Sequence, residues 1–392
     1  MYKEIGITKV KPIGKKGVYD LSVMNCHQFV ANNILNHNSQ EPNLQQIPKT
    51  SVDPNIKKQL VAPDGKLYMA LDYSQAELRI MAHLSGDETY LEAFANGQDP
   101  HLAIAAKKYG IPYEDADKIY SDEQHPDYKL WKNRRKQAKQ ICFGIIYGIQ
   151  AKLLSVKLSD PKAGLIVTPE EAQQQLNEFF HEHPKIKKFM ERQEKILVKQ
   201  GYIKTLFGRK RRLPQIYSEN SAEAAYAVRL SVNTPCQSAA SDMTLFASIL
   251  NYWKMRQGKL PFMPETCTVH DAVYYLATPE EINTWVVHSI WDTCRNPETK
   301  KYFGFNIDDV DMSMDITIGR SMAEELPFIP GYNYKKMLQP DFDPDRYIEE
   351  HRKFKGIDIK DYPKLYPEEI ERNKEDFRKR LYGIQGSTVI PD

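Results

Sequence analysis

The amino-acid sequence predicts an α+β protein, and three observations support this fold class. An apolar run at 66–71, KLYMAL, is typical of a strand and leads directly into QAELRIMAHLSG at 75–86, which has helical spacing. Residues from about 129 to 260 are mostly helical in pattern. The segment TCTVHDAVYYLAT at 266–278 alternates as a β-hairpin does, with Asp271 near its turn.

The remaining elements follow from local signals. Residues 1–38 are β-like, because the short runs VYDLSV and HQFVANNIL alternate and are separated by turn residues. Thr168, Pro169 and Glu171 predict the start of a helix over TPEEAQQQLNEFF. SAEAAYAVRLSV, from 221, predicts another helix. The tail after about 331 is rich in Tyr, Pro and charge, and its low apolar content predicts a peripheral helical extension.

Composition sets the broad class. With 392 residues the chain is long enough for two or three domains. The five cysteines are scattered, which argues against a disulfide framework or zinc ribbon and suits a reducing, cytoplasmic location in a bacterial cell or a viral host. We find no secretory leader and no apolar run near 18 residues, so we expect neither export nor membrane insertion.

The distribution of charge indicates a phosphate-rich partner. Basic and acidic residues number 54 and 52 and nearly cancel. The cations nevertheless cluster in KLWKNRRKQAK at 129–139 and GRKRR at 208–212, both near aromatic residues. A solvated surface is the common explanation of one such run, but two runs beside aromatics favour a nucleic acid or nucleotide.

One helix carries a row of functional candidates. Arg135, Lys139, Phe143 and Tyr147 recur every four residues and so lie along one helix face. An adjoining face is apolar and faces the core: Ala138, Ile141, Cys142, Ile145, Ile146 and Ile149. A merely solvated face would have polar residues at 143 and 147. Two cations followed by two aromatics instead suit a ligand with phosphates at one end and a flat base at the other.

Several motifs resemble, in order and spacing, those of family A DNA polymerases, the DNA polymerase I type. The main matches are DYSQAELR (72–79), RKQAKQICFGIIYG (135–148), NTPCQSAASD (233–242) and VHDA (269–272), with further matches in PNLQQIP (42–48), DPH (99–101) and TLFGRKR (205–211). The resemblance covers residues 39 to about 330. It implies a right-hand polymerase with an antiparallel palm sheet (39–100 and 225–330) and mostly helical fingers (about 101–224), followed by a charged C-terminal extension (331–392).

The resemblance also implies a role for each matched residue. Asp72, Asp271 and the backbone carbonyl of Tyr73 would hold two Mg²⁺ ions. In the nucleotide-binding set, the phosphates would be bound by Arg135, Lys139 and His101. Phe143 would pack on the sugar and base, and Tyr147 would lie where the template base enters. Glu77 would lie against the 2′ position of the sugar. Lys139 would also be catalytic. The set that contacts primer–template DNA would be Asn43, Gln45, Arg229, Asn233, Gln237 and His270. The substrates would be deoxynucleoside triphosphates.

Some positions depart from the family pattern. Ala272 stands where a glutamate usually follows the hairpin aspartate, so a third carboxylate is missing. Cys142 and Ser238 replace a common Asn and Gly. We treat the latter two as variation within the motifs.

The segment before Ser39 resembles the C-terminal motifs of inteins. By composition alone NNILNHNS would be an Asn-rich turn, but VYDLSV…HQFVANNILNHNS matches the intein arrangement. The resemblance implies that Asn38 cyclises, that His37 and His27 act as acid–base groups, and that Ser39 is the nucleophile and first extein residue. Residues 1–38 are too few for a closed intein fold and contain no initiating nucleophile. We therefore expect a split intein, with a separate chain carrying the intein N-terminal fragment and the N-terminal polymerase half.

Two other functions remain open. One is a single-subunit RNA polymerase, which shares the palm architecture, although Glu77 argues against it. The other is a non-catalytic nucleic-acid-binding remnant, which only Ala272 supports. Primer extension with deoxy- and ribonucleotides would decide between the two polymerases.

Overall fold

The computed structural model describes residues 9–13, 18–22, 28–31, 34–37, 54–159, 166–269, 271–295, 298–354 and 357–385, without the side chains before residue 56 or after residue 381. They divide into two compact units. The first comprises Met1–Ser74, Met243–Glu298 and Ser313–Asp392, and the second comprises Gln75–Asp242 and Thr299–Met312.

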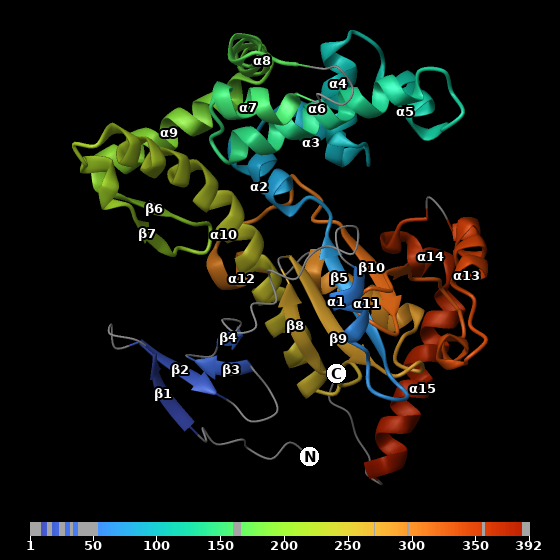
Figure 1. Cartoon of the computed structure of the whole chain (residues 1–392). Helices are drawn as coiled ribbons and strands as arrows, with labels where there is room; N and C mark the ends of the chain where they lie inside the picture. Colours follow the sequence, from blue (N-terminus) through green and yellow to red (C-terminus); the bar gives the residue numbers. More distant parts are fainter. Residues whose placement is uncertain are drawn as a thin grey trace. The chain divides into compact units, whose positions relative to one another are not determined.

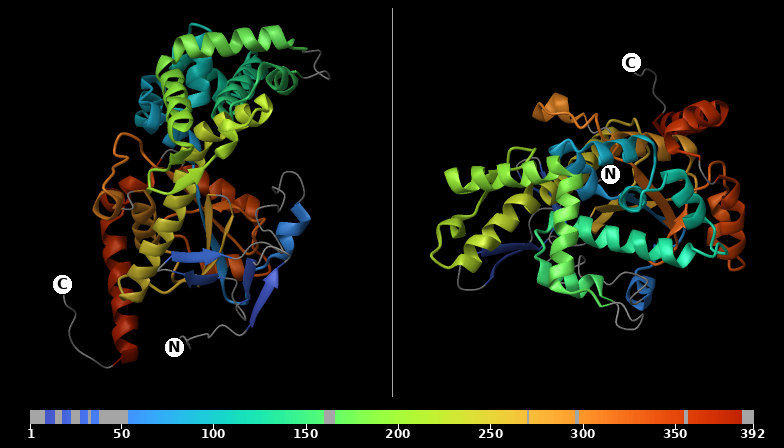
Figure 2. Two further views of the ribbon diagram at one scale, coloured as in Figure 1. Left: turned by 90° about the vertical axis from the view of Figure 1, so that its left-hand side faces the viewer. Right: turned by 90° about the horizontal axis from the view of Figure 1, so that it is seen from above.

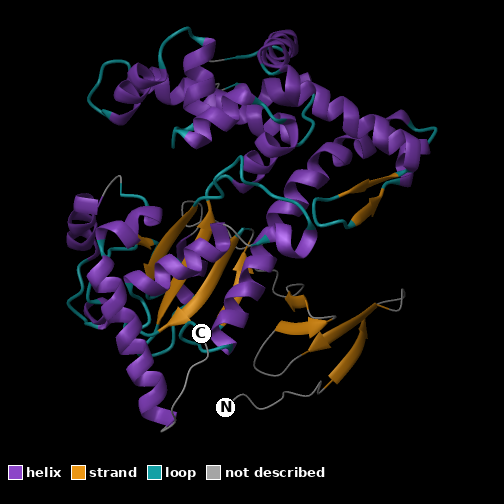
Figure 3. Cartoon of the chain, turned by 180° about the vertical axis from the view of Figure 1, so that it is seen from behind, coloured by secondary structure: helices purple, strands orange, loops and turns teal. Residues whose placement is uncertain are grey.

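The first unit contains a five-stranded antiparallel sheet of order β11-β10-β5-β9-β8 (Figures 1 and 3). Its strands are Leu326–Pro327 (β11), Met314–Gly319 (β10), Leu67–Tyr73 (β5), Ala272–Ala277 (β9) and Glu265–Val269 (β8). The predicted strand at 66–71 is thus confirmed as β5, and the predicted hairpin as β8 and β9. Strand β5 lies at the centre, where Asp72 is opposite Ala272 on one side and Asp315 on the other.

Strand β5 is mostly buried because it pairs with β10 on one side and with β9 on the other, and its apolar side chains face the core. Leu67, Met69 and Leu71 are fully buried, and Ala70 between them is also buried. A large apolar side chain contributes about 1.5–3 kcal/mol when it is removed from water in this way. At the end of the strand, the Tyr73 hydroxyl donates a 2.7 Å hydrogen bond to the carbonyl of Cys294, in helix α11 (Thr284–Arg295). This contact fixes the backbone next to Asp72.

The tail packs onto the first unit through tyrosines. Its elements are η4 (Tyr334–Leu338), α13 (Pro344–His351), η5 (Arg352–Phe354), η6 (Ile359–Asp361), α14 (Tyr362–Leu365) and α15 (Pro367–Gln385). Tyr334 and Tyr347 are buried, and the Tyr347 hydroxyl donates a 2.7 Å hydrogen bond to the carbonyl of Pro327. The tail is helical as predicted. In this tail, tyrosine rings rather than aliphatic side chains supply much of the buried surface.

The N-terminal segment forms strands where it is described. Lys9–Ile13 (β1) pairs antiparallel with Val18–Ser22 (β2), and Gln28–Ala31 (β3) pairs antiparallel with Ile34–His37 (β4). Helix α1 (Pro54–Gln59) follows. That residues 1–38 are an intein fragment stays a prediction.

The second unit is mainly helical (Figures 2 and 3). Its helices are Ala76–Ser85 (α2), Glu88–Ala95 (α3), Pro100–Lys108 (α4), Tyr113–Ser121 (α5), Tyr128–Ile146 (α6), Ala151–Leu158 (α7), Pro169–Glu182 (α8), Pro184–Gln200 (α9) and Thr299–Phe303 (α12). A β-ribbon of Tyr202–Lys204 (β6) and Lys210–Arg212 (β7) precedes Pro214–Tyr217 (η3) and helix α10 (Ser221–Arg256). Within the described residues, no helix has the length and apolar character needed to cross a membrane.

Two sequence predictions about these helices are confirmed. Helix α8 begins with a capping box, in which the Glu171 amide donates to the Thr168 hydroxyl (3.1 Å) and the Thr168 amide to the Glu171 carboxylate (2.7 Å). Helix α6 buries one face with the following residues: Trp131, Ala138, Ile141, Cys142, Ile145 and Ile146. Ile149, also predicted on this face, lies beyond the end of the helix and is half-buried. The row of candidates lies on the outer side of α6.

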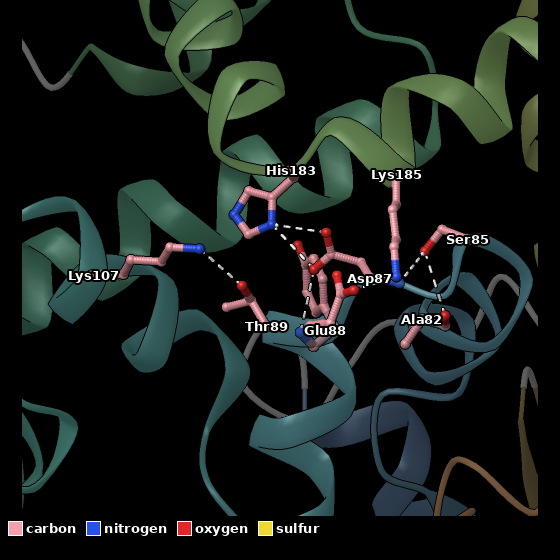
Figure 4. A network of polar contacts seen from close by, with 9 residues as sticks. Ala82, Ser85, Asp87, Glu88, Thr89, Lys107, His183 and Lys185 are labelled. Atoms are coloured by element: carbon pink, nitrogen blue, oxygen red, sulfur yellow. Dashed lines mark hydrogen bonds and ion pairs between the residues drawn. The ribbon is translucent and has the colours of Figure 1, made fainter.

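A polar network links α3 to the junction of α8 and α9 (Figure 4). Asp87 accepts a hydrogen bond from the Tyr90 amide and thereby caps α3. The same carboxylate lies 3.1 Å from Nδ1 of His183, which is fully buried between α8 and α9. Lys185 pairs with Glu88 beside it. Because a buried pair is costly to break, this network holds three helices of the unit in place.

Candidate active site

The two metal-ligand candidates come together at the end of the palm-like sheet. Asp72 lies near the end of β5, and Asp271 lies in the turn between β8 and β9. The two carboxyls lie close enough to interact electrostatically. Asp72 is exposed on one side, but partial removal from water, followed by the charges of Asp271 and Asp315, raises its pKa to about 7. Negative charge is therefore crowded at this point.

This pair fits a magnesium site. Carboxylate oxygens are hard ligands that suit Mg²⁺, and a cation would relieve their repulsion. The part of the chain that the structure describes contains no set of three or more His, Cys, Asp or Glu side chains placed to enclose a metal. One or two carboxylates, completed by substrate phosphates and water, are the usual protein contribution to a Mg²⁺ site.

Ala272 stands where the family pattern has a glutamate, and its place in the sheet shows where the missing carboxylate would lie. Ala272 is directly opposite Asp72 in the sheet, so a glutamate there would point to the same face as Asp72. On the other side of Asp72, strand β10 places Asp315 opposite it. Asp315 accepts a 2.8 Å hydrogen bond from the Ser74 hydroxyl. Sequence reasoning missed Asp315, because nothing local relates a residue in β10 to the motif around Asp72.

In the second unit, Arg135 is held by Asp99. The Arg135 guanidinium donates through Nε (3.0 Å) and one terminal nitrogen (2.5 Å) to one oxygen of Asp99. The other oxygen accepts from the amides of His101 and Leu102, both at 2.9 Å, and so caps helix α4. Burial opposes ionisation of Asp99, but the bond to Arg135 and its charge lower the pKa of this carboxyl overall. The sequence motif DPH contains this cap signal, yet the resemblance gives a role only to its histidine.

His101 lies beside the same row. It is 1% exposed, and neither ring nitrogen has a hydrogen-bond partner among the described residues. Its ring centroid is 5.7 Å from that of Phe143, and the Lys139 ammonium is 5.6 Å from the Phe143 centroid. Burial lowers the pKa of His101 to about 4, and the nearby positive charges of Arg135 and Lys139 act in the same direction. His101 is therefore neutral at pH 7, and both of its ring nitrogens are buried.

The end of helix α6 meets helices α2 and α10. The Tyr147 hydroxyl donates a 2.8 Å hydrogen bond to Oε2 of Glu77, at the start of α2. The next residue, Gly148, has φ of +63°, and a Cβ there would lie 2.6 Å from Cγ of Arg229 in α10. Glycine is required for both reasons. The end of α6 thus contacts α2 through Tyr147 and Glu77, and α10 through Gly148 and Arg229.

Arg229 begins a row on helix α10. Asn233 and Gln237 follow at intervals of four residues and so lie on the same face. Asn233 is buried and its Nδ2 has no hydrogen-bond partner among the described residues, whereas Gln237 is exposed.

The predicted site residues that the structure describes are divided between the two units. Asp72, Tyr73 and Asp271 belong to the first unit, and the second contains Glu77, His101, Arg135, Lys139, Phe143, Tyr147, Arg229, Asn233 and Gln237. Other candidates lie outside the described residues: His27, Asn38, Ser39, Asn43, Gln45 and His270. Only the backbone of His37, at the end of β4, is described.

Comparisons with known proteins agree on one family. The family model described as DNA polymerase family A matches residues 36–324. DNA polymerase I of Pseudomonas aeruginosa is 38% identical over 222 residues, which are 56% of this chain and 22% of that protein. The thermostable DNA polymerase I of Thermus aquaticus is 35% identical over 212 residues, 54% of this chain and 23% of that protein. The chain thus spans less than a quarter of the length of these relatives.

A solved structure has a similar fold. The POL domain of Pol1 from M. smegmatis, in complex with DNA primer-template and dNTP, superposes with a TM-score of 0.60 and 27% sequence identity. The match covers 75% of this chain and 46% of that one.

Proposed function

Because the chain belongs to DNA polymerase family A, we propose that it supplies the palm and fingers of an enzyme that extends a DNA primer on a template. The observation that carries this proposal is the proximity of Asp72, near the end of strand β5, and Asp271, in the turn between β8 and β9 of the same sheet. The similar POL domain binds primer-template and dNTP, which supports these as partners of this chain.

Asp72, Asp271 and the carbonyl of Tyr73 would hold two Mg²⁺ ions. When bound, the ions supply Lewis acidity for the attacking hydroxyl and the triphosphate. The chain's own contribution is geometric. The hydrogen bond from Tyr73 to Cys294 fixes the end of β5, and the hairpin turn brings Asp271 to it.

The face of α6 would bind the incoming nucleotide. Arg135 and Lys139 carry the charge for the triphosphate, and a neutral His101 can donate one hydrogen bond to a phosphate oxygen. The Phe143 ring, between His101 and Lys139, offers a flat apolar surface to the sugar and base. Asp99 keeps the guanidinium of Arg135 oriented before the nucleotide arrives.

Sugar selection and DNA contacts would use residues around the end of α6. Glu77, oriented by Tyr147, would crowd a 2′-hydroxyl and so select deoxynucleotides. Arg229, Asn233 and Gln237 would contact the primer terminus. We propose that His270 also contacts the primer terminus, and that Asn43 and Gln45 contact the template strand.

Replacing Asp271 by Ala tests the metal assignment. We expect weaker Mn²⁺ binding to the variant in electron paramagnetic resonance titrations, and at least about 100-fold slower Mg²⁺-dependent extension by the spliced protein, since a metal contributes several kcal/mol to the transition state. Asp64→Ala, at an exposed loop carboxylate of the same unit, is the control. Unchanged extension in Asp271→Ala would refute the assignment.

We further propose that residues 1–38 are the C-terminal half of a split intein. The family match begins at residue 36, close to the predicted junction at Ser39, which supports a polymerase sequence that resumes there. Asn38 would cyclise with help from His37 and His27, and Ser39 would accept the upstream half carried by a separate chain.

Splicing has a direct test. When the intein N-terminal half is supplied, mass spectrometry should show a ligated product from the natural chain and none from Asn38→Ala. Asn36→Ala, two residues earlier, is the matched control and should still splice. A ligated product from Asn38→Ala, or none from the natural chain, would exclude this mechanism.

A further inference from the structure

Three buried polar atoms of the first unit have no hydrogen-bond partner among the described residues. They are the Ser248 hydroxyl, the Asn251 side-chain oxygen and the Tyr275 hydroxyl. Ser248 and Asn251 belong to helix α10 and Tyr275 to strand β9, and their side chains are 1%, 0% and 3% exposed. A buried polar group without a partner loses its bonds to water and gains nothing in return. Three such groups in one region therefore indicate a ligand that bonds to them.

The three side chains surround one point behind the sheet. Ser248 and Asn251 are three residues apart and so lie on the same face of α10. Burial raises the pKa of Tyr275 well above its usual range, whereas Asn251 and Ser248 are close enough to lower it. Tyr275 is opposite Met69 in the sheet, and Asp72 is three residues further along β5, so its side chain points to the other face. The three atoms therefore lie on the side of the sheet away from Asp72.

The chemistry of the three atoms fits a water molecule. Two are hydroxyls, which can donate or accept, and the third is an amide oxygen, which only accepts. One water molecule can accept from the first hydroxyl, donate to the amide oxygen and bond to the second hydroxyl. These are the three hydrogen bonds that a buried water usually makes.

A metal cation fits this point less well. The three atoms are neutral, so they would not balance its charge. Glu265 is opposite Tyr275 in the sheet, but its carboxyl already accepts a 3.1 Å hydrogen bond from the Thr268 hydroxyl. The Lys254 ammonium donates a 2.7 Å hydrogen bond to the hydroxyl of Thr293 in α11, and its positive charge would repel a cation bound nearby.

We infer that one buried water molecule binds at this point and joins helix α10 to strand β9 through Ser248, Asn251 and Tyr275. By bonding to the Asn251 oxygen, the water orients the amide so that its nitrogen donates a 3.4 Å hydrogen bond to Sγ of Cys294 in α11. The carbonyl of Cys294 in turn accepts the bond from the Tyr73 hydroxyl. The water site therefore supports the end of β5 from behind the sheet.

The sign of a stability change tests this inference. Removing a buried hydroxyl that has no partner raises stability, whereas removing one that is bonded to water lowers it. We expect Tyr275→Phe and Ser248→Ala each to lower the thermal midpoint of unfolding of the full chain by about 2–4 °C. Tyr347→Phe, which loses a direct 2.7 Å hydrogen bond to the Pro327 carbonyl, is the matched control and should fall similarly. An unchanged or higher midpoint in Tyr275→Phe or Ser248→Ala would overturn the inference.

A crystal structure of the full chain, at a resolution that shows ordered waters, gives a direct second readout. One water oxygen should lie within about 2.5–3.2 Å of the Ser248, Asn251 and Tyr275 oxygens. Crystals grown with a rubidium salt distinguish a cation, because Rb⁺ scatters anomalously and water does not. An anomalous peak at this point would overturn the inference and reassign the site to a monovalent cation. Direct hydrogen bonds among the three side chains, with no water between them, would also overturn it.

The outcomes separate this inference from the polymerase assignment. None of the three residues that bond to the water is proposed to bind metal, nucleotide or DNA. Asp271→Ala should therefore keep the water even though its metal binding is weakened. A chain that binds metal through Asp271 but holds no water would contradict only the water site. A chain that holds the water but binds no metal would contradict only the active site.

Discussion

The Tyr147 hydroxyl donates a hydrogen bond of 2.8 Å to Oε2 of Glu77, across 70 residues of sequence. This bond joins the end of helix α6 to the start of helix α2. Glu77 is partly exposed in the first turn of α2, so without Tyr147 its carboxylate would be less restricted to one rotamer. The tyrosine therefore restricts the group that we assign to sugar selection.

The first prediction concerns the hydrogen bond between Tyr147 and Glu77. Tyr147→Phe removes the donor and keeps the ring, so we expect the preference for deoxy- over ribonucleotides to fall about five-fold, in line with a hydrogen bond worth about 1 kcal/mol. Glu77→Ala should reduce it further. The measurement is the ratio of kcat/KM for the two nucleotides in the spliced protein, with Tyr109→Phe as the control. An unchanged ratio in both variants would remove Glu77 from sugar selection, and a spliced protein that prefers ribonucleotides would favour the RNA polymerase.

The second prediction concerns Asp99. Asp99→Asn keeps an oxygen that can cap helix α4 but loses the charge that orients Arg135. We expect the KM for the deoxynucleotide to rise about three- to ten-fold with a smaller change in kcat, because the substitution affects positioning of the triphosphate. Asp115→Asn, which loses an exposed ion pair with Lys118, should leave both values unchanged. Equal changes in the two variants would show that Asp99 has no specific role.

The third prediction uses the ionisation of Glu265. Burial raises its pKa to about 7, although a 3.1 Å hydrogen bond from the Thr268 hydroxyl acts in the opposite direction. The folded protein therefore keeps a proton that the unfolded chain loses at lower pH, and stability falls as pH rises from about 4.5 to about 7. Glu265→Gln cannot ionise. Its free energy of unfolding should exceed that of the natural chain by about 3 kcal/mol at pH 8 and by little at pH 4.5.

Chemical denaturation at the two pH values measures this difference. Glu349→Gln, at an exposed position of helix α13, is the control and should show no such pH dependence. A gain in Glu265→Gln that is the same at both pH values would point to packing rather than ionisation.

The fourth prediction concerns Gly148. Gly148→Ala adds a Cβ at φ of +63° and 2.6 Å from Cγ of Arg229, so both backbone strain and a clash are expected. The strain alone costs about 1–2 kcal/mol. Gly110 has a similar φ of +67° with nothing within 4 Å, and Gly110→Ala therefore measures the strain without the clash. Gly148→Ala should be the less stable variant in urea, and equal losses of stability would mean that Arg229 moves aside freely.

Much of the fold could be predicted because its signals are local. The strand before Asp72, the hairpin at Asp271, the capping box at Thr168 and the buried face of α6 each follow from spacing within a short segment. The same holds for the row from Arg135 to Tyr147, because helical periodicity alone places its residues on one face.

The remaining features depend on interactions between distant segments. Nothing near Arg135 indicates that Asp99 holds it, and nothing near Asp72 indicates that Asp315 is its neighbour in the sheet. The sequence predicts a peripheral tail because the tail has few aliphatic residues. That prediction takes no account of the rings of Tyr334 and Tyr347, which are buried. Sheet order and tertiary pairing are set by the whole chain, and local patterns do not contain them.

The central position of β5 has a consequence for how the protein is made. Its two partners, β9 at 272–277 and β10 at 314–319, are synthesised long after it. Until then a nascent chain exposes an apolar strand with two unpaired edges, a state prone to aggregation and expected to fold slowly. Asp72 can therefore meet Asp271 only late in translation, once the hairpin of β8 and β9 has been made.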